Sequence, residues 1–391
     1  MQNLLAPFNG DISLIDYAAE KGIKEFYGQS KTEIIGGGRS AFNFPDISKS
    51  NLKKAINLMH DYNISFNYTL NSLSLANLEF NPLVQKKIIS QLEYIQKIGV
   101  DSVTLSNPFI MQIVKKNFPN LKICASIISE IRNSEQINFF ESLGVKRIIL
   151  SKHLNKNITG LKKIISKTNV EIQLIVNDPC LAYCPLRNYH NLINGFSSMN
   201  ILNNTFHLSF CTLMCRKIFL ETPEELSRAS WIRPEDLAFY ESLGIGSFKL
   251  VDRKESTPWI KNVLTAYCEK EYDGNFADLC SYFSPIKGKG ELDSNPELRL
   301  LASEDITSIE DIEKNKNNLR FKPFIDNKKI GEYTKRILNN SCTKEECNGC
   351  GLCKLAVDNA IYLDEKQRKK VLCNINLVLN KINSKEFWGV V

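Results

Sequence analysis

Short β-prone runs alternate with helical segments through the first two thirds of the chain, and this repeat restricts the fold more than any other feature. The expected strands cover residues 4–8, 23–28, 65–70, 102–106, 122–127, 147–151, 171–176 and 247–251. Helical periodicity separates them, over residues 11–21, 49–62, 83–98, 109–117, 134–143, 159–167 and 258–270. Such alternation predicts parallel strands joined by crossover helices, and eight units predict a closed (β/α)8 TIM barrel. A doubly wound open sheet is the alternative, but no GxGxxG turn follows a strand to support it.

Polar and charged residues follow several of the expected strands. In a (β/α)8 barrel the carboxyl ends of the strands form the active face, so these side chains are expected to lie at the barrel mouth. The amides and the carboxylate are Asn71, Asn107, Asn177 and Asp178. For these residues, capping of the next helix is the alternative explanation. The cations are Arg39, Lys249 and Arg253, which are suited to an anionic substrate or co-substrate, or to an ion pair that braces the barrel.

Four cysteines lie in the long connection after the seventh expected strand. They form two pairs with three residues between the partners, Cys180 with Cys184 and Cys211 with Cys215. On a helix, that spacing places both sulfurs on one face. Four thiolates satisfy either an iron–sulfur cluster or a zinc ion, so the residues predict a metal centre over the mouth.

A second cysteine group lies near the end of the chain. It has the spacing C-x4-C-x2-C-x2-C and comprises Cys342, Cys347, Cys350 and Cys353. The run CNGCGLC looks like half of a bacterial ferredoxin, but Val357 stands where that motif has its fourth cysteine, so either Cys342 or Cys373 would complete the set. We expect a second iron–sulfur cluster here, with zinc as the alternative. The unpaired cysteines are expected to pack in the core: Cys124, Cys268 and Cys280.

The chain is expected to divide into three parts. Residues 1–272 would form the barrel with a cluster-binding insertion at 177–246, residues 273–338 a polar linker or extension, and residues 339–391 a cysteine-rich module. No run approaches 18 apolar residues, and the first ten residues lack the basic start of a signal peptide, so we expect a cytoplasmic protein without membrane insertion. Twelve cysteines in a reducing compartment indicate metal or redox chemistry before disulfides. The net charge of +7 is dispersed, which favours a solvated basic surface over a nucleic-acid patch.

Several stretches, in order along residues 4–267, resemble the collagenase-like U32 peptidase family. They include Phe26-Tyr27-Gly28, Arg39-Ser40-Ala41-Phe42-Asn43-Phe44, Tyr68-Thr69-Leu70-Asn71, Leu105-Ser106-Asn107-Pro108 and Gly246-Ser247-Phe248-Lys249-Leu250-Val251-Asp252-Arg253. The resemblance implies a (β/α)8 barrel in which four cysteines hold a 4Fe–4S cluster. It also implies a relation to oxygen-independent hydroxylases, or their partners, that modify the ubiquinone precursor ring or bases of transfer and ribosomal RNA.

The chain departs from that family where the substrate would be recognised, so the resemblance does not carry a substrate over. The usual His-Gly-Ala-Leu-Cys after the seventh strand is replaced by Asn177-Asp178-Pro179-Cys180. The leading hypothesis is an iron–sulfur hydroxylase for a small molecule, peptide or nucleotide, with Arg253 and Asp178 as catalytic residues. Substrate binding is assigned to Arg39, Asn71, Asn107 and Lys249. A peptidase is the second hypothesis, although neither a Ser/His/Asp order nor an HExxH motif appears. The third is a non-catalytic subunit that passes electrons to a partner.

Overall fold

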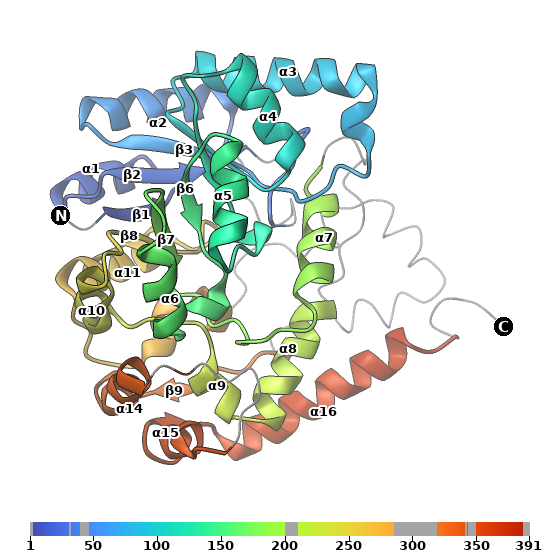
Figure 1. Cartoon of the computed structure of the whole chain (residues 1–391). Coiled ribbons are helices and arrows are strands. Elements are labelled where there is room, and N and C mark those ends of the chain that lie inside the picture. The colour runs from blue at the N-terminus through green and yellow to red at the C-terminus, as the bar shows by residue number, and fades with distance from the viewer. Residues whose placement is uncertain are drawn as a thin grey trace.

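The computed structural model describes residues 3–30, 33–39, 47–199, 210–284, 319–340, 342 and 349–385. Eight strands form one closed barrel, and helices surround it (Figure 1). The strands are β1 Asn3–Pro7, β2 Glu25–Gly28, β3 Ser65–Leu70, β4 Ser102–Leu105, β5 Lys122–Ala125, β6 Val145–Ile149, β7 Glu171–Ile175 and β8 Ser247–Lys249. All neighbours pair in parallel, and Leu5 of β1 pairs with Lys249 of β8 to close the ring. The predicted (β/α)8 barrel is confirmed.

Five of the eight described outer helices begin at a residue whose side chain caps them. The eight are α1 Ser13–Glu20, α2 Lys49–Asp61, α3 Pro82–Lys97, α4 Pro108–Asn117, α5 Ser134–Ser142, α6 Ile158–Ile165, α10 Leu237–Ser242 and α11 Thr257–Glu269. The capped ones are α2 to α6. Asn81 and Asn107 accept hydrogen bonds from the first backbone N–H groups of α3 and α4, each followed by proline at the first helical position. Helix α10 was not predicted. It lies after the cysteine-bearing stretch and provides the crossover from β7 to β8.

The barrel interior is polar toward the amino ends of the strands. Glu25 and Arg147 form a buried ion pair of 2.6 Å there, and Gln173 Nε2 donates to Ser247 Oγ at 2.7 Å. Above these residues an apolar layer fills the barrel, formed by Leu5, Tyr27, Ile149, Ile175 and Val251. The polar side chains at the amino end of the barrel therefore bind one another. The active site of such a barrel is expected at the other end, where the strands have their carboxyl ends.

The connection from β7 to β8 carries three helices before α10: α7 Arg187–Ser197, α8 Phe210–Glu221 and α9 Glu224–Arg228. Cys211 and Cys215 lie one turn apart on α8, as their spacing allows. Cys180 and Cys184 instead lie in non-helical chain before α7, so a shared helix face does not explain this pair.

The C-terminal unit is larger than predicted. It comprises β9 Phe324–Ile325, α14 Asn327–Asn340, α15 Leu352–Ala360, β10 Ile361–Tyr362 and α16 Glu365–Ile382, with β9 and β10 antiparallel. Within the stretch expected as a linker or extension, 273–338, the structure has the short helices η7 Phe276–Leu279 and η8 Ser281–Phe283, and α14 begins at Asn327. The strongly polar composition of α14 hid a narrow apolar stripe, Ile330, Tyr333 and Ile337, which is buried.

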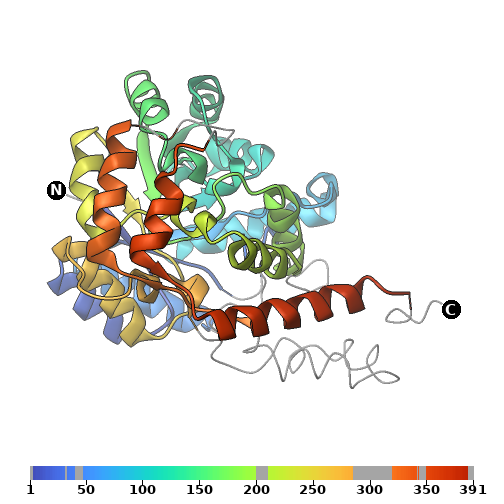
Figure 2. The ribbon, with the colours of Figure 1, turned by 90° about the horizontal axis from the view of Figure 1, so that it is seen from below.

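A buried arginine joins the C-terminal unit to the barrel. Arg233 donates to both carboxylate oxygens of Asp236, at 2.9 and 2.6 Å, and to the backbone oxygen of Asn327 at 2.7 Å. A Cβ at Gly331 would lie 2.8 Å from the same guanidinium, so α14 approaches this closely because it has glycine there. Figure 2 shows α14 and α15 against the barrel and α16 extending away from it.

Candidate functional site

Charged side chains from separate loops meet at the carboxyl ends of the strands. Arg39 Nη2 lies 3.1 Å from Asp252 Oδ2, which joins the loop after β2 to the loop after β8. Lys152, from the loop after β6, donates to Asp178 Oδ2 and lies 3.0 Å from Cys180 Sγ. The predicted residues Arg39 and Asp178 are thus brought to the same mouth, and Lys152 connects this group to the cysteines.

The two carboxylates of the mouth are ionised at neutral pH. Burial acts to raise the pKa of Asp178, but the positive charges of Lys152 and Arg39 outweigh it and lower the pKa to about 2. Asp252 also has a lowered pKa, because the charge of Arg39 outweighs the effect of burial. Burial disfavours the ammonium form of Lys152, yet Asp178 and Cys180 raise its pKa above the ordinary value. The mouth therefore carries positive and negative side chains next to one another, and all of them are charged at neutral pH.

Arg253 lies deeper in the mouth. Its Nη1 donates to Gln29 Oε1 at 3.2 Å, and its guanidinium is 5.4 Å from the ring centroid of Tyr27. Gln29 is only 2% exposed, and its Nε2 has no hydrogen-bond acceptor among the described residues. A buried amide donor without a partner is costly unless a ligand supplies the acceptor. Gln29 and Arg253 therefore fit a substrate group that carries an oxygen acceptor.

The glycine-rich loop after β2 covers one side of the mouth. Gly37 N donates to Ser198 Oγ at 2.8 Å, and Gly38 N donates to Asn71 Oδ1 at 2.6 Å. A Cβ at Gly37 would collide with the Gln29 amide, so Gln29 keeps its present position only while residue 37 has no side chain. The predicted site residue Asn71 therefore lies at the mouth, where it positions the loop.

Two other predicted substrate-binding residues have different surroundings. Asn107 is a helix cap: its Oδ1 accepts from Phe109 N at 2.9 Å, and its Nδ2 donates to Glu79 at 3.1 Å. Both polar groups are engaged, so the structure shows the capping role that was the alternative for Asn107, and its assignment to substrate binding stays a prediction. Lys249 faces the barrel interior with Nζ 3.9 Å from the Tyr27 ring centroid, and burial followed by the charge of Arg253 lowers its pKa to about 7. Lys249 therefore packs against the ring of Tyr27 inside the barrel.

The four cysteines of the β7–β8 connection come together beside this charged group. Cys184 interacts electrostatically with Cys180 and Cys211, and Cys215 interacts with Cys180 and Cys184. Burial raises the pKa of Cys184, raises that of Cys211 to about 11, and raises that of Cys215 further. Without a metal these three thiols are therefore protonated, and a bound metal would replace their protons.

The arrangement of these thiols can be compared with what each kind of metal centre needs. Throughout the described ranges, no three His, Cys, Asp or Glu side chains converge tightly enough for one ion. A zinc ion needs four sulfurs at about 2.3 Å from one point. In a 4Fe–4S cluster each thiolate binds its own iron, so the four sulfurs lie further apart. The described thiols therefore do not form a closed metal site, and the kind of metal centre stays a prediction.

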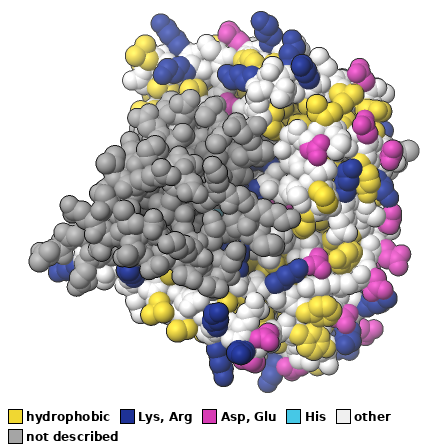
Figure 3. Space-filling model, turned by 180° about the vertical axis from the view of Figure 1, so that it is seen from behind, with side chains coloured by type: hydrophobic (Ala, Val, Ile, Leu, Met, Phe, Trp, Pro, Cys, Tyr) yellow, Lys and Arg dark blue, Asp and Glu magenta, His cyan; other side chains and the backbone are white. Residues whose placement is uncertain are grey.

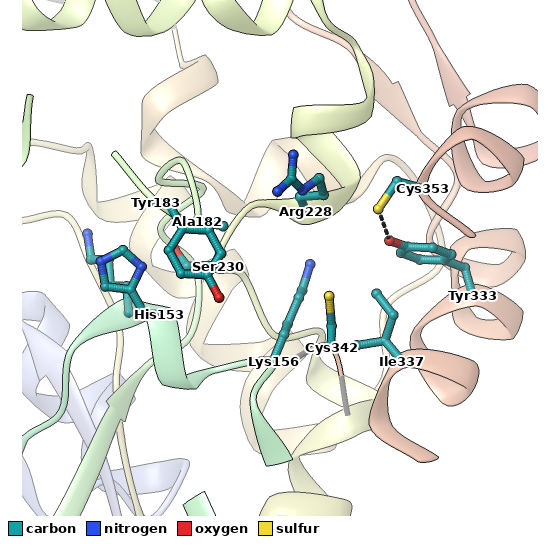
Figure 4. A pocket seen from close by; sticks show the side chains of 11 residues that line it. His153, Lys156, Ala182, Tyr183, Arg228, Ser230, Tyr333, Ile337, Cys342 and Cys353 are labelled. Atoms are coloured by element: carbon teal, nitrogen blue, oxygen red, sulfur yellow. Dashed lines mark hydrogen bonds between the residues drawn. The ribbon is translucent and has the colours of Figure 1, made fainter. Parts of the chain in front are cut away.

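The C-terminal cysteines border a pocket between the barrel and the C-terminal unit. Cys342 and Cys353 line it together with Lys152, Lys156 and Tyr333 (Figure 4). Tyr333 Oη lies 3.1 Å from Cys353 Sγ. Cys350 is exposed, and the predicted ligand Cys347 lies outside the described residues. Cys373 is on the exposed side of α16, so the shared pocket favours Cys342 as the additional ligand.

The outer surface has mixed charge where it is described. In Figure 3, Lys and Arg side chains are interspersed with Asp and Glu over the coloured part of the face. Among the described helices, none combines the length and apolar character that crossing a membrane requires.

Three residues of the mouth were not predicted. Lys152 and Asp252 each follow an expected strand by one residue, and that position was the available signal. Gln29 follows β2 in the same way. The sequence alone did not single them out, because a single polar residue after a strand can equally be a helix cap or a surface residue.

Comparison with known proteins gives a family match and several relatives. The sequence profile of peptidase family U32 matches residues 10–270. An uncharacterized protease of Methanocaldococcus jannaschii is 29% identical over 251 residues, which cover 63% of this chain and 72% of the relative.

Two further relatives are named for RNA hydroxylation. The tRNA hydroxylation protein P of Haemophilus influenzae is 25% identical over 193 residues, covering 48% of this chain and 39% of the relative. The 23S rRNA 5-hydroxycytidine C2501 synthase of Escherichia coli is 22% identical over 252 residues, covering 62% of this chain and 36% of the relative. The matches thus span well under half the length of these two relatives.

Proposed function

Since this chain belongs to peptidase family U32, we propose that it is an iron–sulfur enzyme of the oxygen-independent hydroxylase type. The observation that carries the proposal is the position of Lys152, which contacts both the mouth carboxylate Asp178 and the thiol of Cys180. A redox centre at the cysteines would therefore border the space in which a substrate is held. A redox centre that exchanges electrons with a substrate must lie close to that substrate.

Cys180, Cys184, Cys211 and Cys215 would hold the barrel cluster. When bound, a 4Fe–4S cluster supplies one-electron redox chemistry. The remaining roles belong to the chain itself. Arg253 and Gln29 would hold an anionic or carbonyl oxygen of the substrate or oxygen donor, with the guanidinium giving charge-assisted hydrogen bonds.

Two further residues would position the reactants. Asp178 is held ionised by Lys152 and Arg39, so it would accept a hydrogen bond from a substrate N–H or O–H group. Arg39 keeps 38% of its side-chain surface exposed beside Asp252, which suits a residue at the entrance. We therefore assign Arg253 and Asp178 to the reacting centre and Arg39 to the entry side.

The substrate class that we propose is a nucleotide base within RNA, with a separate electron donor. The support is the names of the relatives, which refer to tRNA hydroxylation and to a 5-hydroxycytidine of 23S rRNA. The dispersed surface charge indicates that other parts of the RNA would be contacted weakly, because phosphate contacts depend on clustered cations. The C-terminal cysteines would hold a second metal centre.

The test combines metal analysis with RNA analysis. The full chain is expressed in a host that lacks RNA base hydroxylation, and the digested RNA is analysed by mass spectrometry for a nucleoside that has gained one oxygen atom. The protein is purified anaerobically from the same cells for iron and sulfide determination. We expect a cluster and an oxygenated nucleoside, and Arg253→Ala should abolish the nucleoside while the cluster absorbance remains. Arg336→Ala, on the exposed side of α14, serves as the matched control.

Two results would contradict the proposal. Stoichiometric zinc without sulfide would exclude the cluster. Hydrolysis of a denatured protein substrate by the purified chain, without any oxygenated nucleoside, would instead favour the peptidase hypothesis.

A further inference from the structure

One carboxylate, that of Glu130, joins three loops at the rim of the barrel mouth. Glu130 follows β5, and its Oε2 accepts from Ser151 Oγ at 2.8 Å and lies 3.8 Å from His153 Nε2, both in the stretch after β6. Its Oε1 lies 3.4 Å from Nη1 of Arg187, the first residue of α7 after β7. The backbone of Glu130 is left-handed, with φ +49°, which is costly for a residue with a side chain. Such a conformation persists where several contacts hold it, so the three loops have a defined arrangement here.

An aromatic pair stands on this arrangement. The ring of Tyr183 is stacked on the ring of His153, with 4.9 Å between the centroids and 23° between the planes. The His153 side chain is only 12% exposed, whereas Tyr183 is 40% exposed. Burial, followed by the charges of Arg187 and Arg132, lowers the pKa of His153 to about 4, so the imidazole is uncharged at neutral pH. Tyr183 is therefore an exposed ring that is backed by a second, buried ring.

The stacked pair adjoins the charged group of the mouth. Both rings line the pocket that Lys152, Lys156 and Arg228 also line, and Figure 4 shows them at one side of it. Lys152 donates to Asp178 Oδ2, so a single residue separates the aromatic pair from the mouth carboxylate. The N–H groups of these three cationic side chains suit a phosphate oxygen as acceptor.

An exposed tyrosine alone would not indicate a ligand, because single apolar groups are normal on protein surfaces. Tyr62 is an example: it is 43% exposed, follows α2 at the amino end of the barrel, and has no stacked ring among the described residues. Tyr183 differs in its backing by His153 and in its position beside the mouth. Proteins hold unpaired nucleobases by stacking them on aromatic side chains and by binding the adjoining phosphates with cations.

We propose that Tyr183 stacks on the base of an unpaired nucleotide that neighbours the nucleotide whose base enters the mouth. The inference rests on the proposed function, because it takes RNA as the substrate. Arg253 is 5% exposed and Tyr183 is 40% exposed, so the two residues lie at different depths and hold different nucleotides. Tyr183 is thus a positioning residue, and it gives the enzyme a preference for single-stranded RNA.

The experiment measures binding of two labelled strands to the full chain, purified anaerobically, by fluorescence anisotropy. One strand is a short single-stranded oligoribonucleotide, and the other has the same ribose-phosphate backbone without bases. Tyr183→Ala should weaken binding of the first strand by about tenfold and leave binding of the second unchanged, because only the first strand can stack. Tyr183→Phe keeps the ring and should bind both strands as the wild type does. Tyr62→Ala is the matched control and should also change neither affinity.

A second measurement uses the wild-type chain, so it does not depend on how well a variant folds. The oligoribonucleotide is made with 5-iodouracil, which crosslinks to a stacked aromatic ring on irradiation, and mass spectrometry should locate the crosslink at Tyr183.

Three results would overturn the inference: unchanged RNA affinity in Tyr183→Ala, an equal loss for both strands in that variant, or crosslinks at other residues only. A wild-type chain that binds neither strand would instead contradict RNA as the substrate, and so the proposed function. Thermal unfolding and iron content are measured for each variant, and if Tyr183→Ala loses either, Tyr183→Phe and the crosslink decide.

Discussion

Arg39 Nη2 lies 3.1 Å from Asp252 Oδ2, and this ion pair joins the loop after β2 to the loop after β8. Strand β1 lies between those two strands in the barrel, so the pair crosses over it at the mouth. Asp252 directly precedes Arg253, whose guanidinium meets Gln29 from the end of β2. The pair therefore fixes the loop that carries Arg253.

We expect Arg39→Ala to reduce kcat/KM by about a hundredfold while the protein stays folded, because a misplaced catalytic group commonly costs that much. Arg39→Lys should recover only part of the activity, since an ammonium cannot reproduce the planar guanidinium. Kinetics and thermal unfolding measure the two effects. Arg132→Ala removes a 53% exposed arginine from the loop after β5 and should have no effect. Equal loss of activity in both alanine variants would contradict the role of Arg39.

The glycine-rich loop gives a prediction that separates positioning from folding. A Cβ at Gly37 would collide with the end of the Gln29 side chain, which can move, so Gly37→Ala should fold and displace Gln29 from Arg253. We expect kcat/KM to fall by about tenfold to a hundredfold. At Gly246 a Cβ would meet nothing within 4 Å, so Gly246→Ala is the control and should keep activity. Wild-type kinetics in Gly37→Ala would show that Gln29 has no part in the site.

The buried carboxyl group of Glu33 should make stability depend on pH. It accepts hydrogen bonds from Tyr68 and Gln91, and burial raises its pKa from the ordinary 4.5 to about 7. The folded state therefore holds this proton more tightly than the unfolded chain does. Its stabilising contribution is complete below about pH 4.5 and is lost as the pH rises through about 7, with a limit of about 3 kcal/mol.

Glu33→Gln resembles the protonated side chain, so this pH dependence should be removed. Denaturant unfolding at about pH 4.5 and about pH 7 gives the free energies of unfolding to compare. Glu93→Gln, at an exposed position on the same helix as Gln91, should retain the wild-type dependence. If Glu33→Gln loses the same free energy as the wild type over this range, another group is responsible.

Arg233 should hold the C-terminal unit on the barrel. Its removal leaves the buried Asp236 carboxylate without its partner, which typically costs about 3 to 5 kcal/mol. We expect Arg233→Ala to lower the unfolding temperature and to make β9 and α14 sensitive to limited proteolysis. Arg336→Ala, exposed on α14 itself, is the control. Unchanged proteolysis in Arg233→Ala would mean that the apolar contacts of α14 are enough to hold the C-terminal unit on the barrel.

The barrel cysteines should differ from the other buried cysteines in their effect on metal content. Cys211→Ser/Cys215→Ser is expected to lose the iron and sulfide of the barrel centre, since a cubane needs four thiolates. Cys124→Ser changes a buried thiol inside the barrel that accepts from Asn67 at 3.4 Å, and iron should be unchanged. Iron analysis of anaerobic protein distinguishes them. Retention of full iron in the double variant would refute the ligand assignment.

The sequence by itself determined the barrel, because strand and helix periodicity are local patterns that each segment carries alone. It also identified both cysteine groups, since ligand spacing is local. It did not reveal α14, where three apolar residues in a polar helix became a buried stripe only in the folded protein. Nor did it distinguish Asn107 as a helix cap from Asn71 as a residue of the mouth, because both follow a strand.

Only the tertiary structure decided which distant residues act together. Lys152 is an ordinary lysine in the sequence, and it becomes important because the fold places it between Asp178, Cys180 and the pocket of Cys353. The same holds for Arg39 and Asp252, which are separated by most of the barrel in the chain. The physical reason is that closure of the sheet brings the first strands beside the last ones, and no local pattern records which side chains then meet.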